Sequence, residues 1–164
     1  MACRGVHFAI TPEEAARLLA ASSDEKVRDI VQLQIEEQWD EQWLYETDKA
    51  WDAIHRCLTD GAVTVTRNGS PFALCILAGA QLHRGEDYIV SLKTPDQVAA
   101  IAAAISTMTQ EQFRERYFKI DKANYGGDVS EDDFEYVWEY FKDLPEFYTK
   151  AAAAKRFVIF TVDQ

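Results

Sequence analysis

Three apolar segments of the chain predict the strands of a sheet. They span residues 3–10, 87–93 and 156–163 and are rich in valine, isoleucine and aromatic residues. Such runs favour extended backbone. The last one, from Phe157 to Val162, is almost continuously apolar, which is typical of a strand that is covered on both faces.

Helical periodicity dominates the rest of the chain. The clearest case is a set of four apolar residues spaced i, i+3, i+4 and i+7, namely Phe134, Val137, Trp138 and Phe141. Three more helices are predicted to begin with the capping box, a threonine followed three residues later by glutamate or glutamine: Thr11 with Glu14, Thr94 with Gln97, and Thr109 with Gln112. We therefore expect an α+β fold, with a small mixed sheet of about three main strands flanked by about six helices.

Two stretches do not fit a single prediction. Residues 31–35 alternate with period two, as a strand would, yet they also continue the apolar stripe of a helix that begins near Ser22. Residues 36–46 mix aromatic side chains with acids in no clean period. We expect irregular structure in the second stretch.

Length and composition predict one folded domain over residues 1–164. The chain has 48% hydrophobic and 12% aromatic residues, which excludes a disordered chain. No apolar run approaches the roughly 20 residues that span a bilayer. Residues 1–5 lack the apolar centre of a secretory signal, and the three cysteines form no CxxC pair. We expect a cytoplasmic protein without membrane attachment.

The net charge restricts the kinds of partner. Aspartate and glutamate together number 28 against 17 lysines and arginines, which gives a formal charge of −11 at neutral pH. Such a chain repels the phosphate backbone of a nucleic acid. It can instead attract a basic protein or peptide, although ordinary solubility explains the same charge.

One predicted helix, within residues 47–61, carries the polar cluster best suited to chemistry. At about 100° per residue, Asp48, Asp52 and His55 fall on one side of it, next to the apolar stripe that contains Trp51. Two carboxylates and an imidazole could bind a divalent metal or support proton transfer. They also fit structural roles, in which Asp48 caps the helix, Asp52 interacts with the helix dipole and His55 packs beside Trp51. Both interpretations stay open.

Three residues from elsewhere in the chain complete this candidate pocket. Gly79 lies in a run of small apolar residues and permits close approach of either a neighbouring element or a small ligand. Arg116 and Tyr117 could approach the pocket from another helix.

The motifs of common enzymes and of metal or cofactor sites are missing. The loop from Asp121 has Gly126 at the sixth position of a calcium loop, but Ala123 and Tyr125 occupy positions that need oxygen ligands. HExxH, GxSxG, P-loop and GxGxxG patterns do not occur. We expect no metal and no cofactor.

A second candidate surface is aromatic. Tyr136, Tyr140 and Tyr148 could form a hydrated aromatic surface that binds a partner. Tyr136 and Tyr140 lie away from the centre of the core stripe of their helix. The alternative is that these tyrosines cover the rim of the core.

Motifs along nearly the whole chain carry a family resemblance. They include DKAWDAIH at 48–55, LTDG at 58–61, FRERY at 113–117, YGG at 125–127 and DDFEYVWEYF at 132–141. On these motifs the chain resembles the YfbM-like family of bacterial proteins, the domain of unknown function 1877. One departure is Gly126, where many relatives are expected to have proline. The resemblance implies a bacterial, cytosolic, single-domain α+β protein and supplies no reaction.

These observations together favour a non-enzymatic binding module with an acidic surface. An antitoxin-like role against a basic protein would fit the charge and the size. The alternative is a hydrolase-type acid/base enzyme, or a metal-binding protein, centred on Asp52 and His55.

Overall fold

The sheet forms the middle of the molecule. The computed structural model describes residues 3–61, 63 and 68–163, so Met1 and Ala2 of the N-terminal segment lie outside it. Within this part of the chain the strands pair in the order β2-β1-β5-β4-β3, and every neighbouring pair is antiparallel. The strands are β1 (Gly5–Ile10), β2 (Leu44–Asp48), β3 (Ala80–Gln81), β4 (Tyr88–Lys93) and β5 (Phe157–Asp163).

Helices account for most of the remaining structure. Three of them begin with the expected capping boxes, at Thr11, Thr94 and Thr109. A π-helix, η1 (Val31–Glu36), continues directly from the second helix. The α-helices are α1 (Pro12–Ala20), α2 (Asp24–Ile30), α3 (Trp51–Leu58), α4 (Pro71–Leu74), α5 (Pro95–Ile105), α6 (Gln110–Tyr117), α7 (Glu131–Phe141) and α8 (Leu144–Ala153).

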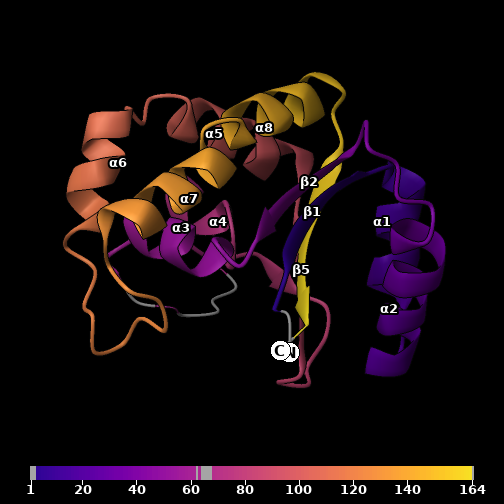
Figure 1. Cartoon of the computed structure of the whole chain (residues 1–164). Coiled ribbons are helices and arrows are strands. Elements are labelled where there is room, and N and C mark those ends of the chain that lie inside the picture. The colour runs from indigo at the N-terminus through magenta and orange to yellow at the C-terminus, as the bar shows by residue number, and fades with distance from the viewer. Residues whose placement is uncertain (1–2, 62, 64–67, 164) are drawn as a thin grey trace.

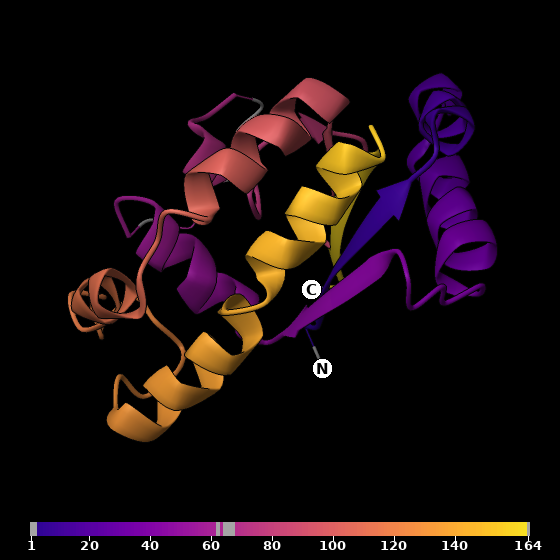
Figure 2. The same ribbon diagram turned by 90° about the horizontal axis from the view of Figure 1, so that it is seen from above.

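The helices lie in two layers, one on each face of the sheet (Figures 1 and 2). α1, α2 and η1 cover one face, and α3 to α8 cover the other. Alternation along β5 shows the division: Ile159 packs with the α1 layer, whereas Val158 and Phe160 pack with the larger layer. β5 is the central strand and its interior is buried, as its unbroken apolar sequence predicts.

The α+β class is confirmed, and three of the strands lie where the sequence predicts them. The sheet itself differs from the prediction, since the described residues form five strands, all antiparallel to their neighbours, instead of about three in a mixed sheet. The two additional strands, β2 and β3, lie at the edges of the sheet and pair with one neighbour each. An edge strand is less buried than a central one, so its sequence shows a weaker pattern of alternating apolar residues. β3 has two residues, and β2 lies partly in the stretch expected to be irregular.

The ambiguous residues 31–35 are helical. Val31 and Ile35 are buried, while Leu33 is exposed. In the helix η1, residues four positions apart lie on the same side, and Leu33 between them lies on the opposite side. None of the helices in the described part of the chain is long and apolar enough to cross a membrane.

Candidate functional site

Asp48 does not belong to the helix that was expected to carry it. α3 begins at Trp51, its N-cap is Ala50, and no side chain caps it. Asp48 is the last residue of β2, with φ of 44° in the left-handed region that aspartate tolerates. The turn that follows is closed by the Ala50 amide, which donates to the Thr47 carbonyl oxygen at 2.9 Å. The prediction that Asp48 caps the helix and shares its face with His55 is wrong, because the strand extends further than helical periodicity indicates.

The Asp48 carboxylate is bound by two other segments. Tyr136 on α7 donates its hydroxyl hydrogen to Oδ2 at 2.8 Å. The guanidinium of Arg4 lies 3.4 Å from Oδ1 and also binds Glu46. This carboxylate therefore connects β2 to α7 instead of contributing to a pocket on α3.

Asp52 forms an ion pair one helical turn along α3. Its carboxylate accepts a hydrogen bond from Nε of Arg56. The same guanidinium donates to the carbonyl oxygens of Gly61, at 3.1 Å, and of Asn124, at 2.9 Å. Arg56 is 9% exposed, so its charge holds two loops against α3. The i, i+4 spacing of opposite charges was the sequence signal for this pair.

His55 is a core residue. It is 2% exposed, and its Nδ1 has no hydrogen-bond partner among the described residues. Burial lowers the pKa of this imidazole to about 4, although nearby Asp52 acts in the opposite direction. Its neighbour Trp51 is also in the core and donates from Nε1 to the Cys3 carbonyl oxygen at 2.9 Å. A general acid or base needs an open concavity, and the His55 side chain is enclosed instead.

The other three expected pocket residues do not converge on His55 either. The Arg116 guanidinium donates to the Cys57 carbonyl oxygen at 3.1 Å and lies over the ring of Phe72. Tyr117 is buried, and its hydroxyl donates to Oδ2 of Asp133 at 2.5 Å. Each therefore connects helices within the larger layer.

Gly79 serves close packing of backbone. Its φ is 135°, and a Cβ at this position would lie 2.6 Å from the Leu92 carbonyl oxygen of β4. The sequence left two explanations for Gly79 open, a neighbouring element or a small ligand. In the structure, the backbone of β4 approaches Gly79 closely.

Polar groups that sequence reasoning missed lie beneath the larger helical layer. Lys93, at the end of β4, is completely buried, and its ammonium donates to the Ile76 carbonyl oxygen at 2.7 Å and to the Ser91 hydroxyl at 2.5 Å. No salt bridge to a carboxylate is formed by Lys93 within the described residues. Burial lowers the pKa of Lys93 to about 7. The sequence did not indicate that Lys93 is buried. It lies at the end of a strand, next to the capping residue Thr94, and strand ends are normally exposed to solvent.

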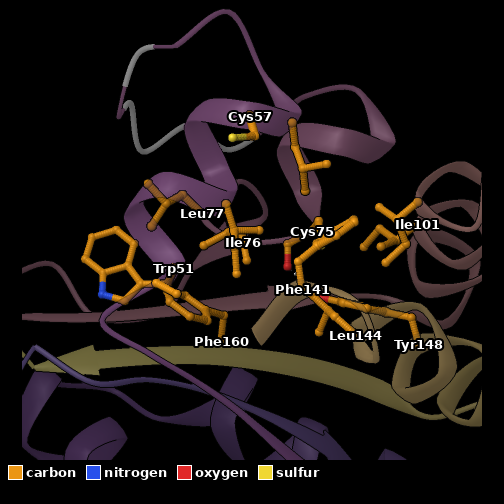
Figure 3. Close-up of a cluster of buried hydrophobic side chains, with 14 of the residues drawn as sticks. Trp51, Cys57, Cys75, Ile76, Leu77, Ile101, Phe141, Leu144, Tyr148 and Phe160 are labelled. Atoms are coloured by element: carbon orange, nitrogen blue, oxygen red, sulfur yellow. Dashed lines mark hydrogen bonds between the residues drawn. The ribbon is translucent and has the colours of Figure 1, made fainter. Parts of the chain in front are cut away.

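His7 and Tyr148 occupy the same buried region. The Cys75 carbonyl oxygen accepts hydrogen bonds from Nε2 of His7 at 3.1 Å and from the Tyr148 hydroxyl at 2.6 Å. Figure 3 shows Cys75 and Tyr148 surrounded by apolar side chains of this core. Burial, assisted by the charge of Lys93, lowers the pKa of His7 to about 3. The interface prediction for Tyr148 is therefore wrong: the tyrosine is fully buried because α8 presents it to the sheet side of the layer.

The other two interface tyrosines lie on α7. Tyr136 and Tyr140 are partly buried, with ring centroids 5.1 Å apart in an edge-on arrangement. The Tyr136 hydroxyl binds Asp48 at the end of β2, and the backbone carbonyl oxygen of Tyr140 accepts from the Tyr45 hydroxyl of β2 at 2.9 Å. The two partly buried tyrosines therefore lie at the edge of the core, where α7 meets β2.

Exposed acids line the outside of the same helix. At about 100° per residue, Asp132 and Glu139 point away from the buried stripe of Phe134 and Phe141. Asp143, the N-cap of α8, follows the helix and is exposed as well. Glu135 lies beside them and is exposed as well. We call this surface the α7 acidic face and define it by Asp132, Glu135, Tyr136, Glu139, Tyr140 and Asp143.

These features describe a three-layer α+β protein with a carboxylate and tyrosine surface on one outer helix. The profile of the family described as "Domain of unknown function (DUF1877)" matches residues 1–161, and the chain belongs to this family. The fold is similar to the crystal structure of a protein of unknown function, YfbM from Escherichia coli, with a TM-score of 0.69 and 15% sequence identity over 97% of this chain and 99% of that one. No protein of curated function matches the chain.

Proposed function

We propose that this chain is a non-enzymatic interaction module that binds a basic protein or peptide through the α7 acidic face. The observation that carries the proposal is the placement of four exposed carboxylates, those of Asp132, Glu135 and Glu139 on α7 and that of Asp143 just after it. Two partly buried tyrosines, Tyr136 and Tyr140, border them. Tyrosine is enriched at protein interfaces, and their rims are polar.

The charge of the whole chain supports a basic partner. A formal charge of −11 attracts cationic proteins over a long range and accelerates their encounter. An antitoxin-like role, in which the module covers the basic surface of a toxin, is one form that such binding would take.

The arrangement of the other candidate residues also favours binding over catalysis. The carboxylates of Asp48 and Asp52 have internal cationic or hydroxyl partners. His55 is enclosed, and its lowered pKa keeps the imidazole neutral at physiological pH. The alternative of an acid/base enzyme centred on Asp52 and His55 therefore has little geometric support.

The test is a binding titration with a panel of basic peptides. We expect fluorescence anisotropy to show association at low ionic strength that weakens as salt is added, because screening acts on exposed charges. The variant Glu135→Gln/Glu139→Gln/Asp143→Asn should weaken binding by about tenfold.

A matched control separates this face from net charge alone. The variant Glu13→Gln/Asp29→Asn/Glu41→Gln removes the same charge from exposed positions on α1, α2 and the segment that follows η1. It should change binding less than about twofold, through long-range attraction only. Equal losses in both variants, or no salt-dependent binding to any peptide, would refute the proposal.

A further inference from the structure

The chain contains two asparagines, Asn68 and Asn124, and both are exposed. Glycine follows the first and tyrosine follows the second. We propose that Asn68 is a modification site, where the side-chain amide is converted to aspartate and isoaspartate without an enzyme, and that the fold protects Asn124 from the same reaction.

The reaction at Asn68 needs only the Asn68–Gly69 dipeptide and water. The backbone amide nitrogen of Gly69 attacks Cγ of the Asn68 side chain and forms a C–N bond, while the bond from Cγ to Nδ2 breaks. The proton of the Gly69 amide leaves with the departing nitrogen as ammonia. The five-membered succinimide that remains adds one water molecule at either of its two carbonyl carbons, which gives aspartate or isoaspartate. No electrons are transferred, so no oxidant or reductant takes part.

Two local features make Asn68 suitable for this attack. The chain bends at Asn68, and Asn68, Gly69 and Ser70 are all exposed, so water reaches this segment. Glycine has no Cβ to crowd the approach of its nitrogen to Cγ, and its backbone reaches more conformations than that of other residues. The Gly69 nitrogen can therefore reach Cγ of Asn68 with little steric resistance.

Asn124 is exposed as well, yet its contacts oppose the reaction. Its Nδ2 donates to Oδ2 of Asp121 at 2.6 Å, and its backbone amide donates to the Asp121 carbonyl oxygen at 3.0 Å. Its own carbonyl oxygen accepts from Nη2 of Arg56 at 2.9 Å. The attacking nitrogen here belongs to Tyr125, whose hydroxyl donates to Asp133 at 2.9 Å. Reaction at Asn124 therefore requires these hydrogen bonds to break, and the Tyr125 Cβ also crowds the attacking nitrogen.

The products differ from the original chain in charge and in backbone length. Each product has one more negative charge than asparagine, because a carboxylate replaces the neutral amide. Isoaspartate also carries the main chain through the side-chain carboxyl carbon, which lengthens the backbone by one methylene group. This change lies two positions before Ser70, whose Oγ caps α4 by accepting from the Ala73 amide at 3.3 Å.

Incubation of the full chain at mildly alkaline pH and body temperature, followed by mass spectrometry of its proteolytic peptides, tests the site. We expect the Asn68 peptide to gain about one dalton, since OH replaces NH2, and to separate into two products. An isoaspartate carboxyl methyltransferase should label one of them. The Asn124 peptide should stay unchanged over the same period. An unmodified Asn68 peptide, or equal modification of both asparagines, would overturn the proposal.

A matched variant separates the effect of the fold from that of the dipeptide sequence. Tyr125→Gly places glycine after both asparagines, and circular dichroism checks its folding. We expect Asn68 to react severalfold faster than Asn124 in the folded variant, because Asp121 and Arg56 still hold Asn124, and the two rates to converge in urea. Equal rates in the folded variant would overturn the protection of Asn124. If the variant does not fold, the wild type decides: Asn124 should react faster in urea than in the folded chain, and an equal rate would overturn the protection.

Discussion

The Tyr136 hydroxyl donates a hydrogen bond to Oδ2 of Asp48 at 2.8 Å, across 88 positions of sequence. It joins the middle of α7 to the end of β2, an edge strand of the sheet. Asp48 was expected in the candidate pocket, and Tyr136 at the candidate interface. The contact places Asp48 beside the α7 acidic face and separates it from His55.

Removing this hydrogen bond should destabilise the protein measurably. We expect Tyr136→Phe to lower the free energy of unfolding by about 1 kcal/mol, because a hydrogen bond to a partly exposed carboxylate has a modest net value. Chemical denaturation of Tyr136→Phe, Asp48→Asn and the double variant measures it. The double variant should lower the free energy of unfolding by less than the sum of the losses in the two single variants. If the two losses simply add, the two side chains do not interact energetically.

Gly79→Ala should be strongly destabilising. The substitution places a methyl group 2.6 Å from the Leu92 carbonyl oxygen and forces an L side chain to φ of 135°. The cost should be at least about 2 kcal/mol, which is typical of backbone strain combined with a clash. Gly126→Ala is the control, because a Cβ there has no neighbour within 4 Å. Similar melting temperatures for the two variants would contradict this account.

Lys93 should make stability increase with pH above neutrality. Its pKa is about 7 in the folded protein against an ordinary value of 10.5, so the unfolded chain binds more protons between these values. The free energy of unfolding should therefore rise by up to about 2 kcal/mol from pH 7 to about 8.5. Below about pH 7 Lys93 is protonated in both the folded and the unfolded chain, so it no longer makes the free energy of unfolding depend on pH. Above pH 9 the buried Cys75 thiol, with a pKa raised to about 12, acts in the opposite direction.

A methionine substitution isolates the lysine contribution. Lys93→Met keeps most of the volume and removes the titrating amine, so the rise in stability between pH 7 and 8.5 should disappear. Lys122→Met, at an exposed position, should retain it. A wild-type profile that is flat over this interval would show that Lys93 is not held with a lowered pKa.

His7 and His55 should favour unfolding in mild acid. The pKa of His7 is about 3 and that of His55 about 4, both below the ordinary value of 6.5 because of burial. The unfolded chain therefore takes up more protons below pH 6.5, and stability should fall as the pH drops from 6.5 towards 4. NMR should show both imidazoles neutral at pH 5. His55→Leu should reduce the slope of stability against pH by up to one proton in this range, and an unchanged slope would contradict the burial argument.

Local signals in the sequence predicted much of the secondary structure. The capping boxes at Thr11, Thr94 and Thr109 begin helices as expected. Their threonine oxygens and N3 side chains act within a single turn, so no distant contact is needed to specify them. The continuous apolar run of β5 likewise predicted its central position.

The candidate site was harder to predict. Helical spacing correctly placed Asp52 and His55 on one helix, but Asp48 lies in a strand. Its role depends on Tyr136, which comes from α7. The burial of Lys93 depends on residues far from it in the chain, such as Ile76 and Phe160, and has no local signature.

The sequence alone determined the family, the α+β class and the acidic and amphipathic helices, because these follow from composition, motifs and short-range periodicity. Only the tertiary structure decided which polar groups are enclosed and which are available. It enclosed His55, His7 and Lys93 and left the carboxylates of Asp132, Glu135 and Glu139 on α7 exposed. The physical reason is that burial is set by which faces pack together, and these faces come from residues that are far apart in the chain.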